Sequence, residues 1–143
     1  MLFWLISYFR YTNVYTAQIF LLQAPIRSKE KAKKFRELLT AKGGTISDDL
    51  LDDMQRCPIR TYDETIMDDP VARRLKEALE LNSESLKMLI NEKFGDGVMS
   101  SVDMKIKVQK VKSDTGDKVQ IIMEGKYCPF TEQIDGETVN TKE

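Results

Sequence analysis

The residues of this chain best placed to do chemistry follow a turn bracketed by two glycines, in residues 91–101 (NEKFGDGVMSS). Gly95 lies where a helix commonly ends in a left-handed residue, and Gly97 predicts a second bend two residues later. We expect that bend to leave Ser100 and Ser101 on irregular backbone, where hydroxyl and amide N–H groups can face a ligand. A Gly-Asp-Gly turn on its own is more often just a helix end followed by a tight connection.

Upstream, Arg74 and Glu77 lie three residues apart in a segment that starts with Asp69-Pro70. An aspartate followed by proline is a favourable N-cap and first helical position. On a helix, two side chains three residues apart share a face. Taken alone, the pair is a surface ion pair that contributes roughly a few tenths of a kcal/mol.

The chain contains no histidine, which excludes Ser-His and Cys-His nucleophile pairs, imidazole bases and His-ligated zinc within this polypeptide. Its two cysteines, Cys57 and Cys128, form no CxxC pair and are typical of free thiols in a reducing compartment. Acid–base chemistry must therefore come from carboxylates, lysine, tyrosine or the substrate. The sequence predicts no metal site and a cytoplasmic location.

Composition narrows the class further. The 143 residues predict one domain, or two small ones sharing a core, and a net charge of −1 with 31% charged residues is ordinary for a soluble protein. Neither a basic excess for nucleic acid nor an acidic, disordered composition is present. The apolar residues 1–9 are too few to cross a bilayer and lack a preceding basic region, so we expect no membrane role.

Periodicity divides the chain into a helical part and a mixed part. Helices are expected over 14–22, over 29–42 and after Ser47, followed by a linker over 57–67. A further helix from 70 to 94 is interrupted at Asn82-Ser83, as a hairpin or a sharp kink. The pattern then changes to alternation, which predicts strands over 102–109 and 119–123 with a turn at 113–117. Because a two-stranded ribbon is marginal alone, we expect it to pack on a helix or on another chain.

The basic residues of 29–36 leave two interpretations open. They are typical of a solvated helix face, and they also allow a nucleic-acid surface, although no aromatic platform accompanies them. We favour the solvated face.

The string EKFGDGVMSSVDMKIKV, with DPVARRLKEAL before it and VQIIMEGKYCPF after it, resembles the C-terminal domain of cyanase (cyanate lyase, or cyanate hydratase). The resemblance runs from about Asn13 to Thr131 and is densest over 69–130. It implies an α+β fold in which an N-terminal helical bundle (1–57) precedes a C-terminal catalytic domain (58–131) that intertwines into dimers; 132–143 would be a polar tail. Members of this family normally have further helices upstream of Asn13. We therefore expect a truncated or misassigned N-terminus, with residues 1–12 atypical.

The resemblance also implies a site. Arg74, Glu77 and Ser100 match the family's catalytic residues, and Ser101 and Cys128 are expected to contribute to substrate binding. Cyanases use bicarbonate as a co-substrate and no cofactor, and they build the site between dimers of a decamer, with several subunits contributing. In this chemistry, guanidinium groups bind the two anions, the Ser100 hydroxyl donates a hydrogen bond, and Glu77 orients the arginines.

Three positions depart from the family pattern. Arg73 replaces an aromatic residue beside the catalytic arginine and would add charge near the site or the interface. Ser101 stands where alanine is common, and Cys128 stands where leucine is usual. Two alternatives to an active cyanase follow: an oligomeric cyanase-like protein with impaired catalysis, and a helix-turn-helix-type DNA-binding regulator.

Overall fold

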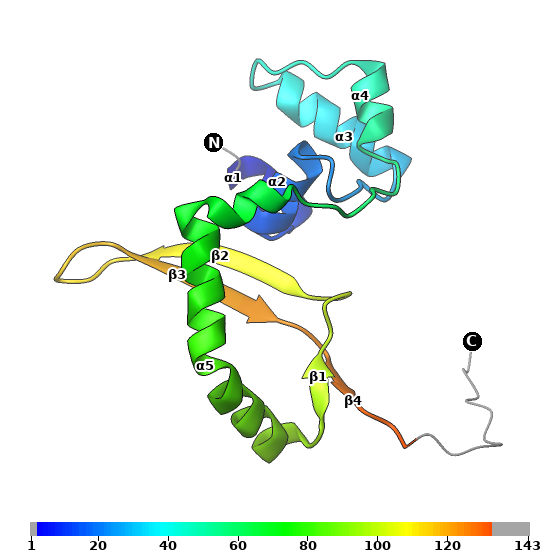
Figure 1. The fold of residues 1–143 in the computed structure, drawn as a ribbon. Coiled ribbons are helices and arrows are strands. Elements are labelled where there is room, and N and C mark those ends of the chain that lie inside the picture. Colours follow the sequence, from blue (N-terminus) through cyan, green and yellow to red (C-terminus); the bar gives the residue numbers. More distant parts are fainter. Residues whose placement is uncertain (1–2, 133–143) are drawn as a thin grey trace. The chain divides into compact units, whose positions relative to one another are not determined.

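A computed structural model describes residues 3–132 of the chain, and Figure 1 shows the elements in order. The chain forms two compact units. The first, called here the helical unit, comprises residues up to Ile66 together with Met104–Glu124. The second, the C-terminal unit, comprises Met67–Asp103 and the residues from Gly125 onward. The expected polar tail lies, apart from its first residue, outside the described residues, and the division at residues 57 and 58 stays a prediction.

Four helices form the first part of the helical unit: α1 (Phe3–Phe9), α2 (Asn13–Phe20), α3 (Lys29–Thr40) and α4 (Asp48–Asp53). Hydroxyl side chains cap three of them. Thr12, Ser28 and Ser47 each accept a hydrogen bond from an N–H in the first turn of the helix that follows. The helices expected near 14–22, 29–42 and after Ser47 are confirmed, with ends within a few residues.

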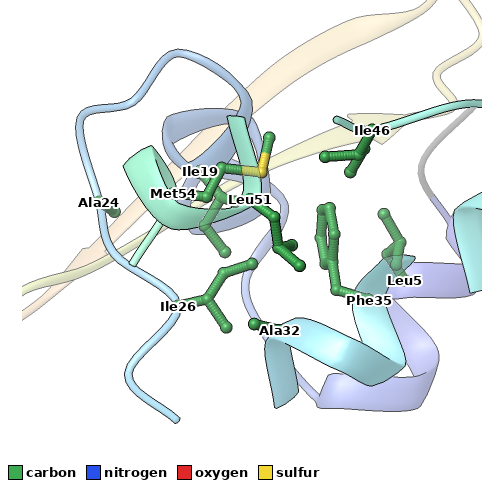
Figure 2. Packing of buried hydrophobic residues seen from close by; sticks show 9 residues of the cluster. All are labelled: Leu5, Ile19, Ala24, Ile26, Ala32, Phe35, Ile46, Leu51 and Met54. Carbon is green, nitrogen blue, oxygen red and sulfur yellow. The ribbon is translucent and has the colours of Figure 1, made fainter. Parts of the chain in front are cut away.

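The core of this unit is a cluster of apolar side chains, and the residues at its centre have no contact with solvent. Phe35 is fully buried, and the rings of Phe9 and Phe20 lie with centroids 6.1 and 5.4 Å from its own. The first helix takes part as well, since Leu5 of α1 is also fully buried. Figure 2 shows the side chains converging; the cluster consists of Leu5, Ile19, Ala24, Ile26, Ala32, Phe35, Ile46, Leu51 and Met54.

The ribbon of the helical unit pairs β2 (Lys105–Val111) with β3 (Lys118–Glu124) in antiparallel register. The Asn13 side chain closes part of the free edge of β2: its amide nitrogen donates to the Val108 carbonyl at 2.6 Å, and its oxygen accepts from the Val108 N–H at 3.1 Å. Two expectations were wrong. Val102 lies in an exposed bend before the strand, and only Ile106 of β2 is half-buried in the single chain.

The expected linker contains a short 3-10 helix, η1 (Glu64–Asp68), which precedes the long α5 (Pro70–Phe94). Asp69 caps α5 by accepting from the Val71 N–H at 2.8 Å, as the sequence predicts. The hairpin expected as one alternative at Asn82-Ser83 is wrong, since α5 continues through both residues. Their side chains bond to carbonyls of the preceding turn, those of Ala78 and Glu80.

After Gly95, which ends α5 at a φ of 92°, the chain enters β1 (Gly97–Met99) and pairs with β4 (Tyr127–Pro129). The bend expected at Gly97 is therefore wrong. Glycine is needed there for close approach, since a Cβ would lie 2.5 Å from the Cys128 carbonyl oxygen and 2.6 Å from the Tyr127 ring. None of the described residues of the C-terminal unit is buried. Nowhere in residues 3–132 is a helix both long and apolar enough to cross a bilayer.

Candidate active site

Arg74 and Glu77 lie in the first turns of α5, directly after its Asp69 cap. A guanidinium nitrogen of Arg74 donates to the Glu77 carboxylate at 2.5 Å, and the two side chains are 80% and 48% exposed. An ion pair this exposed contributes little to stability because water and salt screen it. What matters for function is the group that the remaining guanidinium donors of Arg74 can bind.

Arg73 adds a positive charge next to this pair in the sequence, but its side chain bonds to a different group. Its guanidinium donates to the Asp68 carbonyl at 2.9 Å, at the end of η1. This contact directs the charge back along the chain, toward the start of α5. Arg73 and Arg74 are therefore not equivalent groups in the single chain.

Ser100 follows β1 on irregular backbone, as the sequence predicts, and is half-buried, while Ser101 is exposed. The Ser100 N–H donates to the Lys126 carbonyl at 2.8 Å, which extends the β1–β4 pairing by one bond. Its Oγ accepts from the Val102 N–H at 3.2 Å. The turn after β1 thus fixes both the backbone and the side-chain oxygen of Ser100.

Asp103 completes this turn, and sequence reasoning missed it. Its carboxylate accepts a hydrogen bond from the Lys126 N–H at 3.3 Å. The Ser100 hydroxyl, through a hydrogen bond, is the main cause that lowers the pKa of Asp103, and the Lys126 N–H and charge add to the effect. An ionised carboxylate only accepts, so Ser100 is the donor. The Ser-x-x-Asp spacing was the available signal.

Cys128 lies on β4 opposite Val98, and its thiol contacts the Lys126 carbonyl at 3.8 Å. Ser100, after β1, and Cys128, within β4, thus both contact the Lys126 carbonyl. Among the described residues of one chain, no hydrogen bond or ion pair connects Arg74 or Glu77 with the turn at residues 100–103, called here the Ser100 turn. Nor do any three His, Cys, Asp or Glu side chains in residues 3–132 gather closely enough to hold a metal ion.

An open hollow of about 400 Å³ lies between α5 and the β1–β4 pair. Its lining is mainly apolar and includes Leu79, Leu86, Ile90, Val98, Met99 and Phe130. Leu79, Leu86 and Phe130 are 56%, 45% and 63% exposed. In the single chain, no described residue covers the apolar side chains that line this hollow.

The basic residues of α3 are partly neutralised. Lys34 pairs with Glu37 at 3.1 Å, Arg36 pairs with Asp48, and the Lys31 ammonium lies over the Tyr11 ring. These contacts support the solvated-face interpretation of this helix.

Comparison with known proteins agrees with the resemblance seen in the sequence. Over 123 residues the chain is 39% identical to cyanate hydratase of Arabidopsis thaliana, which covers 85% of this chain and 70% of that protein. The chain belongs to the cyanate hydratase family. The family model described as the cyanate lyase C-terminal domain matches residues 64–132, which include all five expected site residues. Cyanate hydratase of Phaeodactylum tricornutum is 43% identical over 124 residues, covering 85% of this chain and 62% of that protein.

The fold agrees as well. The crystal structure of cyanase from T. urticae superposes with a TM-score of 0.75 at 25% identity, covering 92% of this chain and 88% of that one. The resemblance seen in the sequence and the α+β fold class are thereby confirmed.

Proposed function

We propose that this chain is a cyanate lyase that decomposes cyanate, with bicarbonate as co-substrate, to ammonia and carbon dioxide. Membership of the cyanate hydratase family carries the proposal, together with the presence of Arg74, Glu77 and Ser100 inside the matched segment. No histidine or resident metal is required, because the reaction joins two small anions and handles negative charge.

The reaction balances without a redox partner. A bicarbonate oxygen attacks the cyanate carbon, and the resulting dianion takes up one proton and loses carbon dioxide, which leaves carbamate. Carbamate takes up a second proton and breaks into ammonia and a second carbon dioxide. The protein must hold two like-charged reactants together and stabilise the charge on the intermediate.

Arg74 is suited to that task. Its planar guanidinium remains charged and offers paired donors that match carboxylate geometry. Glu77 occupies one donor nitrogen and fixes the side chain, while the 80% exposure of Arg74 leaves the other donors accessible. In this scheme Arg74 binds the anions and Glu77 orients it.

The Ser100 turn provides the second half of the site. Ser100 supplies its hydroxyl group, the adjoining Ser101 supplies a backbone N–H, and Cys128 contributes a small apolar wall beside them. No hydrogen bond joins Arg74 and Ser100 in one chain, and we propose that copies from different subunits meet at the site. The exposed apolar side chains of α5 and the hollow beside them support such an assembly, proposed here as a decamer built from intertwined dimers.

We further propose that the enzyme works without a cofactor and in the cytoplasm, where free thiols such as Cys57 and Cys128 persist. The alternative, an assembled protein without turnover, makes the opposite prediction in the same assay.

The test is ammonia release from cyanate by the purified protein, with and without bicarbonate, alongside its sedimentation behaviour. Release that requires bicarbonate is the expected result. An assembled protein that releases no ammonia would overturn the proposal and leave the impaired-protein alternative.

A further inference from the structure

A side chain of α2 bonds to the outer edge of β2. The Asn13 amide nitrogen donates to the Val108 carbonyl at 2.6 Å, and the Asn13 oxygen accepts from the Val108 N–H at 3.1 Å. A carboxamide offers an acceptor oxygen and a donor nitrogen, as a peptide group does. Asn13 therefore gives Val108 the two hydrogen bonds that a neighbouring strand would otherwise give it.

The register of the ribbon shows which backbone groups this edge presents. Val108 lies opposite Ile121. In an antiparallel pair, residues bonded to the partner strand alternate with residues whose N–H and C=O point away from it. Because both groups of Val108 bond to Asn13, Val108 is of the outward kind, and so are Ile106 and Lys110 on either side. Asn13 thus reaches the middle one of the outward-facing residues of β2.

The surroundings of this contact are open. Two hollows of about 260 and 450 Å³ lie between β2 and the segment that leads into α2. Residues 104–106 line the first, and residues 107–109 line the second together with Asn13. A directional contact, more than dense packing, therefore protects this edge.

The second strand of the ribbon indicates what an unprotected edge would bind. β3 (KVQIIME) contains no proline or glycine, its one lysine and one glutamate cancel in charge, and every residue is exposed in the single chain. Val119, Ile121 and Ile122 favour extended backbone. Segments of this kind pair readily with free strand edges. The β3 strand of a second copy is therefore well suited to add to the β2 edge.

We propose that Asn13 blocks strand pairing at the β2 edge: its carboxamide occupies the N–H and C=O of Val108, which a β3 strand from a second copy would otherwise use. An added strand bonds at every second residue, so a side chain at the middle position interrupts the whole ladder. The inference is independent of the proposed function, because it concerns a backbone edge outside the candidate site.

The experiment compares full-length Asn13→Ala, Asn13→Asp and Gln55→Ala with wild type. Alanine removes both hydrogen bonds to Val108. Aspartate keeps the acceptor oxygen, loses the donor to the Val108 carbonyl, and adds a charge, which discourages pairing at a strand edge. Gln55→Ala is the matched control, since the Gln55 amide also donates to a backbone carbonyl of the helical unit, that of Leu51 at 3.1 Å. Thr12 still caps α2 in every variant.

Aggregation is followed by light scattering and thioflavin T fluorescence at equal protein concentration. Asn13→Ala should form sheet-rich aggregates roughly tenfold faster than wild type, the factor expected when loss of about one net hydrogen bond opens the edge. Asn13→Asp and Gln55→Ala should behave like wild type. Wild-type behaviour of Asn13→Ala would overturn the proposal. Equal aggregation of the alanine and aspartate variants would also overturn it, because general destabilisation would then be the cause.

Hydrogen exchange in the wild-type protein gives a second test, which holds even if a variant does not fold. With single-residue resolution by mass spectrometry and correction for intrinsic rates, the Val108 N–H should exchange roughly tenfold more slowly than those of Ile106 and Lys110. Equal exchange at the three positions would refute the proposal, since the edge would then be either open throughout or paired throughout.

Discussion

The two units of this chain differ in what each can bury alone. The helical unit has a core of nine buried apolar residues centred on Phe35. The C-terminal unit has none among its described residues, although α5 carries five leucines, all exposed in the single chain. Burial of apolar surface is the main favourable contribution to folding, so the C-terminal unit needs a partner surface that the helical unit does not. In the proposed assembly, the unit that contains the site residues is thus the one that needs contacts with another chain.

The largest loss of activity is expected from a substitution that prevents the C-terminal units of different chains from assembling. Leu86, 45% exposed and part of the hollow beside β1, is placed to contact another copy. Leu86→Asp would bury a carboxylate in that contact, at a cost that exceeds the contact's gain. We expect smaller particles by analytical ultracentrifugation and complete loss of ammonia release.

Ile59→Asp is the matched control for this variant, because Ile59 is 86% exposed and lies outside the C-terminal unit. It should assemble and turn over like wild type. Normal assembly of Leu86→Asp would show that the hollow is not an interface.

Removal of site groups should separate chemistry from assembly. Arg74→Ala and Ser100→Ala are each expected to lower kcat/KM by roughly 100- to 1,000-fold, the range found when one charge-stabilising donor is removed. Both substitutions leave the apolar side chains of the hollow in place, so particle size should not change.

Lys76→Ala is the control for Arg74→Ala, because Lys76 is a neighbouring cation on α5 paired with Glu80 at 3.6 Å. It should keep most of the turnover. Retained turnover in either site variant would remove that residue from the mechanism.

A cavity in the core of the helical unit should lower the stability of the folded chain. Phe35→Ala removes a fully buried ring and is expected to cost about 3–5 kcal/mol in the free energy of unfolding, measured by urea denaturation. Leu79→Ala, at a position 56% exposed in one chain, should cost far less in dissociated protein. Equal costs under dissociating conditions would contradict the contrast between the units.

The smallest effect concerns the start of α5. Asp69→Ala removes the acceptor for the Val71 N–H and should cost about 1 kcal/mol. Asp69→Asn, which retains a capping oxygen, should restore most of that stability in the same denaturation experiment. Failure of asparagine to rescue would mean that Asp69 acts through its charge.

These contrasts also explain what the sequence could predict. Caps at Ser47 and Asp69 and the Gly95 helix end rest on short-range chemistry, and the structure confirms them. The errors fall where other parts of the chain decide the outcome: Asn82-Ser83 continue a helix by bonding to carbonyls one turn earlier, and Gly97 meets β4. The Asp103 contact depends on Lys126, 23 residues away, and local spacing alone could not establish it.

The central claim, that Arg74 and Ser100 of one site come from different chains, is tested most directly by mixing two inactive variants. Arg74→Ala and Ser100→Ala subunits would be dissociated, mixed and reassembled, with each variant reassembled alone as the control, and ammonia release measured with cyanate and bicarbonate. If the site is shared, mixed particles contain some sites with both native groups and recover a measurable fraction of wild-type turnover. If mixed particles of normal size remain as inactive as either variant alone, both groups come from one chain and the account is wrong.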